Sequence, residues 1–310
     1  MHDKSITMEK QSKFQKFKKK IYKDRYSYYL MAPYLIIFGT FTVLSVFMSI
    51  VLSFTNFNLL EFPKFVGFDN YIRLFLEDEL FITAIKNTLI IAIITGPISF
   101  ILAFVVAWLI NELPKKWRWF MTLVFYAPSI SGNAYLLWKL IFSSDMYGYA
   151  NSFLLKNGLI TEPITWLQDP KYVIWIIILV QFWLSLGVSF LAFIAGLQNV
   201  NTSLYEAGAI DGVRNRWQEL WYITLPQMRP QLLFGAVMQI TASFGVADVS
   251  AAIAGYPSVE DAGHTIVLHL MDYGGMRFEM GYASAIATIL FMIMLASNIV
   301  VQKFLRRVGS

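Results

Sequence analysis

Long stretches without a charged residue alternate with short charged segments along this 310-residue chain. A helix needs about 20 mostly apolar residues to cross the hydrocarbon core of a membrane, and five of the six uncharged stretches reach that length. The exception, Pro230–Ala247, resumes as apolar sequence after Asp248 and continues to Ala254. The six stretches are Tyr26–Leu60, Asn87–Asn111, Trp119–Trp138, Tyr172–Tyr205, Pro230–Ala247 and Met280–Gln302.

This pattern predicts an all-α integral membrane protein with six transmembrane helices. The helical domain covers residues 29–304, preceded by a basic tail, 1–28, and followed by a short end, 305–310. Gly96-Pro97 predicts a kink in the second span, while Pro128 and Gly132 predict a third span that is bent or partly unwound. The expected spans are Tyr29–Phe54, Asn87–Ile110, Phe120–Ile141, Val173–Gly196, Gln231–Ala254 and Gly281–Phe304.

Composition and charge support this interpretation and orient the chain. Hydrophobic residues make up 57% and charged residues 15%, against about half and a quarter in soluble domains. Lys and Arg concentrate in cytoplasmic loops. With six spans, both termini and every second loop lie on the same side of the membrane, and these four segments hold 18 of the 25 basic residues. Both termini are therefore expected in the cytoplasm. The four segments are Met1–Ser27, Asn111–Arg118, Asn199–Arg229 and Lys303–Ser310.

The net charge of +5 lies mostly in the tail beside the first span, where it favours anionic lipid headgroups. It is not a nucleic-acid signal. The chain has no Cys and three His, so disulfides, thiol chemistry and the usual zinc sites are not expected. No phosphate-binding loop of the Gly-x4-Gly-Lys-Ser/Thr form occurs, so this chain is not expected to hold ATP or another cofactor.

The most informative segment is the loop 199–230 between spans four and five. Ser203 and Glu206 have the spacing of a capping box, which predicts a helix that starts near Ser203. Small residues at 207–209 make one side of that helix thin, and Gly212 is expected to end it. Pro226 is expected to end a second short helix. The plainer alternative is that Glu206 only caps its own helix and the glycines only turn the chain.

This loop resembles the hallmark of the membrane subunits of binding-protein-dependent ABC importers, in which Glu-Ala-Ala, three residues and Gly precede Ile-x-Leu-Pro. Gly208 replaces the third motif residue, and the gap from Gly212 to Ile223 is one residue longer than the commonest spacing. The matching residues are Glu206, Ala207, Gly208, Gly212, Ile223, Leu225 and Pro226.

Other segments are similar to the sugar branch of this family, which contains the membrane subunits of the maltose transporter. They are the segment 65–71 (Phe-Val-Gly-Phe-Asp-Asn-Tyr), Asn87-Thr88-Leu89 at the start of span two, and 281–285 (Gly-Tyr-Ala-Ser-Ala) at the start of span six. The resemblance extends from Tyr29 to Phe304.

The resemblance implies a non-enzymatic permease subunit in the bacterial cell membrane. It implies a second, related permease, two ATPase subunits that bind ATP and magnesium, and an external solute-binding protein that delivers a saccharide, expected to be an oligosaccharide. The helix that docks on the ATPase would carry Glu206, Ala207, Gly208, Asp211 and Gly212. Glu206 would pair with a basic group there, and Asp211 would do likewise or cap the next turn.

Polar residues within the spans are candidates for the substrate pathway. Gln181, Ser185 and Ser189 are expected to share one face of span four. The alternative is that small polar residues bond neighbouring helices, and that Asp248 only contacts external water. By position, the resemblance to the maltose subunits transfers sugar contacts to Gln181, Ser185, Thr241 and Gly245. The candidates are Asn133, Tyr135, Gln181, Trp183, Ser185, Ser189, Gln239, Thr241, Ser243, Gly245 and Asp248.

Two other classes of protein remain as alternatives. A membrane enzyme acting on lipid-linked or sugar substrates would need acidic and His side chains clustered near one membrane face, and the candidates are Asp261, His264, His269 and Asp272 in the last external loop. A channel or receptor has no use for the patterned loop 199–230. For an importer, polar and aromatic spans favour a neutral or weakly charged saccharide.

Overall fold

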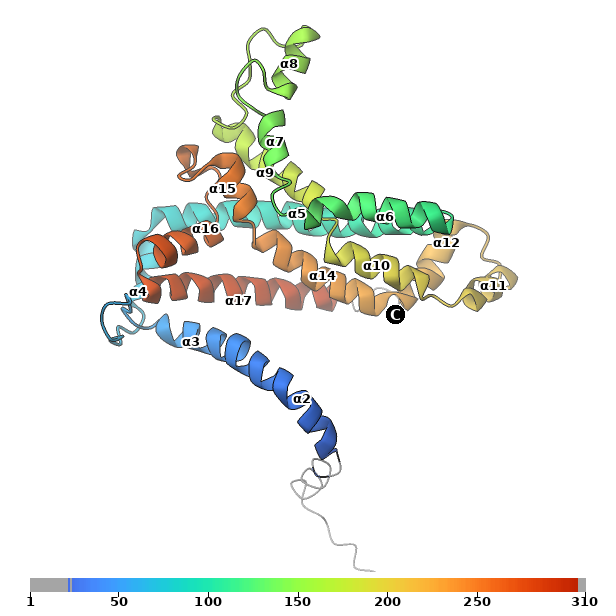
Figure 1. The fold of residues 1–310 in the computed structure, drawn as a ribbon, viewed down its shortest axis with the longest axis horizontal. Coiled ribbons are helices and arrows are strands. Elements are labelled where there is room, and N and C mark those ends of the chain that lie inside the picture. Colours follow the sequence, from blue (N-terminus) through green and yellow to red (C-terminus); the bar gives the residue numbers. More distant parts are fainter. Residues whose placement is uncertain (1–21, 23, 306–310) are drawn as a thin grey trace, which may run out of the picture. The chain divides into compact units, whose positions relative to one another are not determined.

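The computed structural model describes residue 22 and residues 24–305, and its regular structure there is helical (Figure 1). The predicted tail 1–28 and end 305–310 lie largely outside these residues. The chain divides into two compact units, 1–51 and 52–310, which we describe separately.

In the first unit, one helix fills the described part. Helix α2 (Arg25–Phe38) passes through a π-helical turn (Gly39–Val43) into α3 (Leu44–Leu52) without interruption. Its 28 residues are apolar enough to cross a membrane, and by helical rise they measure about 40 Å. Pro33 lies within α2, in the part of the helix that precedes the π-helical turn.

Four further candidate spans lie in the second unit. They are α5 (Glu79–Asn111), α9 (Pro170–Leu184) with α10 (Val188–Gln198), α14 (Arg229–Phe244) with α15 (Asp248–Ala254), and α17 (Met280–Leu305). The predicted third span is divided into α6 (Lys115–Ile130) and α7 (Leu136–Ile141). Because α6 has only 16 residues, the described residues contain five helices long enough to span, and not six.

The centre of this unit is a three-helix contact among α5, α10 and α14. Phe193 of α10 is fully buried there and packs edge-on against Phe100 and Phe104 of α5. Gly235 of α14 lies directly against the Phe193 ring, so that a Cβ atom at this position would overlap it. The absence of a side chain at Gly235 therefore allows α14 to approach α10 closely.

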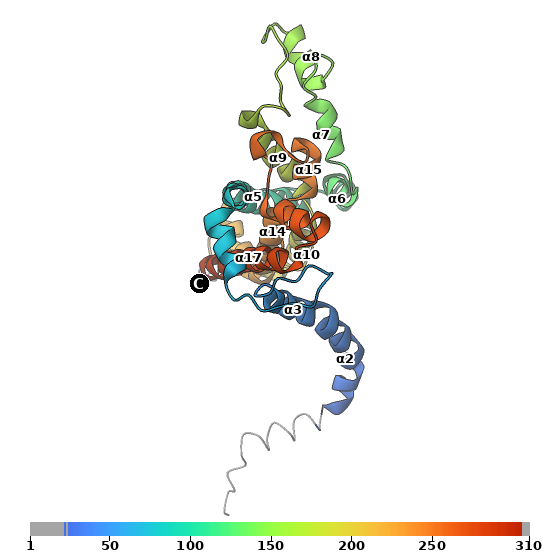
Figure 2. The ribbon, with the colours of Figure 1, turned by 90° about the vertical axis from the view of Figure 1, so that its left-hand side faces the viewer.

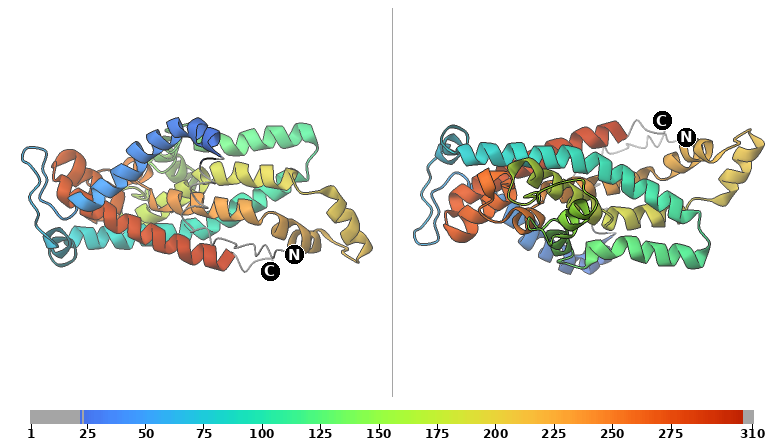
Figure 3. Two further views of the ribbon diagram at one scale, coloured as in Figure 1. Left: turned by 90° about the horizontal axis from the view of Figure 1, so that it is seen from below. Right: turned by 90° about the horizontal axis from the view of Figure 1, so that it is seen from above.

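The two ends of the second unit carry different elements (Figures 2 and 3). The turn 112–114 and helices α11 and α12 lie at one end, and α17 runs from the opposite end toward them. The opposite end carries α4, α16 and the first turn of α5, while α7 and α8 project from the side (Figure 1). The short helices are α4 (Asp69–Ile72), α8 (Tyr149–Lys156), α11 (Thr202–Ile210), α12 (Arg216–Glu219), α13 (Leu225–Gln227) and α16 (Ile266–Met271).

Candidate functional site

Three of the apolar helices are interrupted. Residues 131–135 separate α6 from α7, residues 185–187 separate α9 from α10, and residues 245–247 separate α14 from α15. Non-helical backbone within a membrane is tolerated where it is buried in protein or lines a water-filled cavity, and broken helices mark the binding sites of many transporters. Each break contains one glycine: Gly132, with a φ of +62°, Gly187 and Gly245.

Residues at or next to the three breaks line a cavity of about 200 Å³. Where the first two breaks meet, a Cβ atom built on Gly187 would lie 3.6 Å from Cβ of Ser129. The cavity is lined by Pro128, Ser129, Gly132, Tyr135, Gln181, Leu184, Ala242, Gly245, Val246, Ala247, Asp248 and Val249.

Four predicted pathway residues, Tyr135, Gln181, Gly245 and Asp248, line this cavity. Gln181 is buried, and its Nε2 donates to the carbonyl oxygen of Ala242 at 3.2 Å, which joins α9 to α14 across the cavity wall. Asp248 is exposed and forms no hydrogen bond or ion pair with the described residues. Tyr135, also on the wall, donates through its hydroxyl to Oδ1 of Asn133 at 3.0 Å.

The other predicted pathway residues lie outside the cavity wall. Trp183 packs edge-on against Trp138, with ring centroids 5.7 Å apart. Ser185 donates to the carbonyl of Phe182 at 2.6 Å, and Thr241 donates to a carbonyl within its own helix at 3.0 Å. These hydroxyls pair with the ends or turns of the helices that carry them.

The expected polar face of span four is not continuous. Gln181 belongs to α9 and Ser189 to α10, because the chain leaves the helix between them. Ser189 instead donates to Oε1 of Gln239 on α14 at 3.1 Å, and both side chains are buried. This pair acts as the interhelical bond that was the alternative interpretation.

Sequence reasoning did not single out Ser129 and Ala242 as wall residues. Ser129 follows Pro128 in the last turn of α6, so the Pro-Gly signal in span three did point to the right segment. Ala242 has no polar side chain and contributes its backbone carbonyl. Nothing in its residue type indicates a site.

The loop 199–230 contains the expected helix, α11, but its start differs from the prediction. Asn201 is the N-cap, and its side chain accepts the amide of Ser203 at 3.0 Å. Ser203 therefore lies inside the helix, and Ser203 and Glu206 do not form a capping box. Asn is as good an N-cap as Ser, and it comes first along the chain.

Gly212 ends α11 in a Schellman motif. Its φ is +94°, its amide donates to the carbonyl of Ala209 at 3.4 Å, and the amide of Val213 donates to that of Gly208 at 2.9 Å. Gly208 is buried, and a Cβ atom there would lie 2.6 Å from Cδ1 of Ile223. Glycine at the third motif position therefore makes room for the isoleucine of the same motif.

The remaining motif residues, Glu206, Ala207 and Asp211, are exposed. Below them, Arg216 forms ion pairs with Glu219 of its own helix at 2.7 Å and with Glu112, next to the end of α5, at 3.1 Å. The loop is thus joined to the end of α5 through Arg216, while Glu206, Ala207 and Asp211 are exposed on α11 and at its end.

The second helix of this loop ends at Gln227, one residue after Pro226. The chain continues from α12 through a π-helical turn (Leu220–Thr224) into α13, which contains Pro226.

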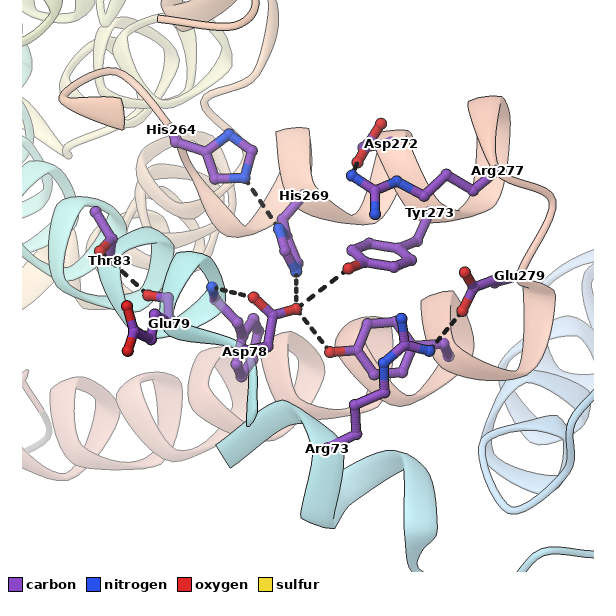
Figure 4. Close-up of polar contacts among 12 residues, drawn as sticks. Arg73, Asp78, Glu79, Thr83, His264, His269, Asp272, Tyr273, Arg277 and Glu279 are labelled. Atoms are coloured by element: carbon purple, nitrogen blue, oxygen red, sulfur yellow. Dashed lines mark hydrogen bonds and ion pairs between the residues drawn. The ribbon is translucent and has the colours of Figure 1, made fainter. Parts of the chain in front are cut away.

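A buried polar cluster lies at the opposite end of this unit (Figure 4). Oδ2 of Asp78, the N-cap of α5, accepts from Nε2 of His269 at 3.0 Å and from the hydroxyl of Tyr282 at 2.7 Å. Nδ1 of His269 in turn lies 3.0 Å from Nε2 of His264. Because Asp78 accepts from His269, His264 is the donor to His269 when both rings are neutral.

The surroundings shift the protonation of this cluster. Burial works to raise the pKa of Asp78, but the hydrogen bonds from Tyr282 and from the amide of Phe81 hold it below its ordinary value. Burial lowers the pKa of His269 in spite of Asp78. Burial and the neighbouring His269 lower the pKa of His264 to about 4.

The cluster does not favour a membrane enzyme. His264 and His269 are 3% and 1% exposed, and their ring nitrogens bond to each other and to Asp78, so no substrate reaches them. Asp272 pairs with Arg277 at 2.7 Å. The sequence separates Asp78 from His269 by 191 positions, which is why residue patterns did not reveal the pair.

Apolar helices that break around one polar cavity define a membrane transport protein. Residues 87–310 match the family described as binding-protein-dependent transport system inner membrane component, and the chain belongs to this family. It is therefore a multi-pass inner-membrane permease component.

Several relatives have names that specify transport. The chain is 34% identical over 270 residues to the probable ABC transporter permease protein YesP of Bacillus subtilis (strain 168), covering 86% of this chain and 85% of that protein. It is 31% identical over 284 residues to the lactose transport system permease protein LacF of Rhizobium radiobacter, with 89% and 91% covered. It is 29% identical over 278 residues to the arabinooligosaccharides transport system permease protein AraP of Bacillus subtilis (strain 168), with 89% and 87% covered.

The fold is also shared with a solved structure. A chain from a bacterial ABC transporter involved in the import of the acidic polysaccharide alginate superimposes with a TM-score of 0.75. The sequences are 24% identical, and the match covers 95% of this chain and all of that one. This likeness concerns the fold alone.

Proposed function

We propose that this chain is a permease subunit of an ATP-driven importer and that a saccharide, delivered by an external solute-binding protein, crosses the membrane through the cavity at the three helix breaks. The observation that carries the proposal is the meeting of these breaks around Gln181 and Asp248. Relatives named for lactose and arabinooligosaccharide transport support a saccharide.

We infer six spans with both termini in the cytoplasm. The helix of the first unit counts as span one, and α6 with α7 counts as span three although α6 alone is short. The distribution of basic residues supports this topology. So does the grouping of the turn 112–114 and the loop 199–230 at one end of the second unit, toward which α17 runs (Figure 3).

The energy would come from two ATPase subunits that dock on the exposed face of α11. Glu206 and Asp211 offer carboxylates for basic groups of such a partner, and the thin surface at Ala207 lets it approach. The ion pairs of Arg216 would transmit the movement of the loop 199–230 to the end of α5. Rigid-body movement of the attached helices would then switch access to the cavity. ATP and magnesium belong to the ATPase, and a second, related permease completes the pathway.

Purification and reconstitution test this function. A tagged chain should bring an ABC-type ATPase and a second permease with it, and in proteoliposomes ATP hydrolysis should rise when the saccharide-loaded binding protein is added. The variant Gly212→Leu changes the loop 199–230 and no cavity-lining residue. It serves as the uncoupled control, and its ATP hydrolysis should not rise when the loaded binding protein is added. A chain that purifies without an ATPase, or a complex whose hydrolysis ignores the loaded binding protein, would contradict the proposal.

A further inference from the structure

The cavity wall includes the carboxyl-terminal turns of three helices. Ser129 lies in the last turn of α6, Gln181 and Leu184 in that of α9, and Ala242 in that of α14. The macrodipole places about half a negative elementary charge at such an end. Carbonyls of these turns already accept hydrogen bonds: that of Ala242 from Gln181, that of Phe182 from Ser185 and that of Tyr126 from Ser129.

Asp248 adds a full negative charge to this wall. Among the lining residues that the structure describes, none is Lys, Arg or His, and Asp248 is the only acidic one. It is exposed and has no ion-pair partner among the described residues. Its charge is therefore not cancelled within the cavity.

Three helices begin at the same breaks, and their amino-terminal ends carry the opposite partial charge. Helix α10 contributes no residue to the cavity wall. Tyr135, the N-cap of α7, and Asp248 and Val249, the first two residues of α15, do line it. These two ends offset the partial charge of the carboxyl-terminal ends, so Asp248 is the lining group that carries a full charge.

We propose that this cavity is a charge filter that favours neutral and cationic saccharides and disfavours anionic ones, with Asp248 as the residue that determines this specificity. The proposal rests on the proposed transport function. A saccharide hydroxyl donates to carbonyl and carboxylate oxygens, whereas a uronate, sulfate or phosphate group is repelled by them. The same fold serves an importer of the acidic polysaccharide alginate, so this selection resides in the cavity side chains and not in the fold.

Charged thiol reagents measure this potential directly. The chain has no cysteine, so Ala242→Cys places one thiol on the cavity wall. In membrane vesicles that contain the full chain, we would compare its rates of reaction with a cationic and an anionic methanethiosulfonate, read as the mass added to the intact chain. The rate with the cationic reagent is divided by the rate with the anionic one. This ratio at residue 242 is then divided by the same ratio at Asn157→Cys, an exposed position at the end of α8, which removes the intrinsic reactivities of the two reagents.

The cationic reagent is expected to be favoured at residue 242, and Asp248→Asn should lower the normalised ratio about tenfold, which corresponds to about 1.4 kcal/mol. Asp248→Glu keeps the charge and should keep the ratio. With Asn at 248 the ratio should fall toward one, because no other lining residue that the structure describes is acidic or basic. The ratio at Asn157→Cys should not change.

Three results would overturn the filter: a ratio at residue 242 equal to that at 157, a ratio that Asp248→Asn leaves unchanged, or no reaction at 242 with either reagent. The measurement needs no sugar and no ATP. Loss of saccharide uptake by the unmodified complex would therefore refute the transport function, while an unchanged rate ratio would refute the filter alone.

Discussion

Replacing Gly212 by alanine tests the link between the loop 199–230 and energy coupling. Gly212 has a φ of +94°, and a Cβ atom built on it would meet no atom of this chain within 4 Å. Within the chain, the substitution therefore introduces backbone strain and no steric overlap. Leucine introduces the same strain and adds bulk that only a partner can meet.

The magnitude follows from the backbone conformation. An L-residue with a side chain costs about 1–2 kcal/mol in the left-handed region, and that amount changes an equilibrium about 5- to 30-fold. The two hydrogen bonds that close α11, from the amides of Gly212 and Val213, depend on this conformation. If the partner binds only the native loop, its apparent affinity falls by up to the same factor. The loss is too small and too local to unfold the bundle.

The assay is the amount of ATPase that co-purifies with the tagged chain, together with hydrolysis stimulated by the loaded binding protein. We expect Gly212→Asn to be the mildest substitution, because Asn tolerates positive φ, Gly212→Ala to be intermediate and Gly212→Leu to be the most severe. Equal losses for Ala and Leu would mean that strain alone acts and that no partner lies close to residue 212. Full stoichiometry and full stimulation in all three variants would refute the coupling role of this loop.

Three further predictions concern other parts of the chain. On whole cells, an impermeant maleimide should label Ser258→Cys but not Ser203→Cys, and labelling at 203 would contradict the topology. Gln181→Leu removes the bond to Ala242 at the cavity wall and should reduce saccharide uptake without loss of assembly; unchanged uptake would limit Gln181 to packing. The pKa of His264 is lowered to about 4 in the folded protein, against about 6.5 in the unfolded chain. As pH falls, His264 is therefore protonated in the unfolded chain before it is protonated in the folded protein. The folded protein should therefore lose about 2 kcal/mol between pH 7 and pH 5 through this residue, and His264→Gln should flatten the pH dependence of Tm over that interval; equal slopes would show that His264 does not titrate on unfolding.

The positions of the spans were largely predictable, because the length of an apolar run is a direct requirement of the bilayer. Predicted and observed ends differ by at most three residues for the fourth, fifth and sixth spans, whereas α5 begins at Glu79, eight residues before the predicted start of span two at Asn87. The third span was expected to be bent or partly unwound around Pro128 and Gly132, and the helix does stop between them, at Ile130. Pro and Gly close together disfavour a helix by several kcal/mol, and both residues can be read directly from the sequence.

The breaks in spans four and five were not predicted. Gly187 and Gly245 stand alone in apolar runs, and a single glycine disfavours a helix by only about 1 kcal/mol. Contacts made after folding decide whether such a position breaks. The N-cap was missed for a similar reason, because Asn201 and Ser203 are nearly equal as caps and only the path of the chain selects between them.

The setting of Asp248 arises from these unpredictable breaks. An uninterrupted span four or five would leave no break beside Gln181 or Ala242. Asp248 would then only contact external water, as one interpretation of the sequence held. The breaks instead place this carboxylate on the wall of one cavity together with Gln181 and Ala242. For this reason the Asp248→Asn and Ala242→Cys pair tests whether the charge, which the sequence shows, acts at the cavity, which only the fold creates.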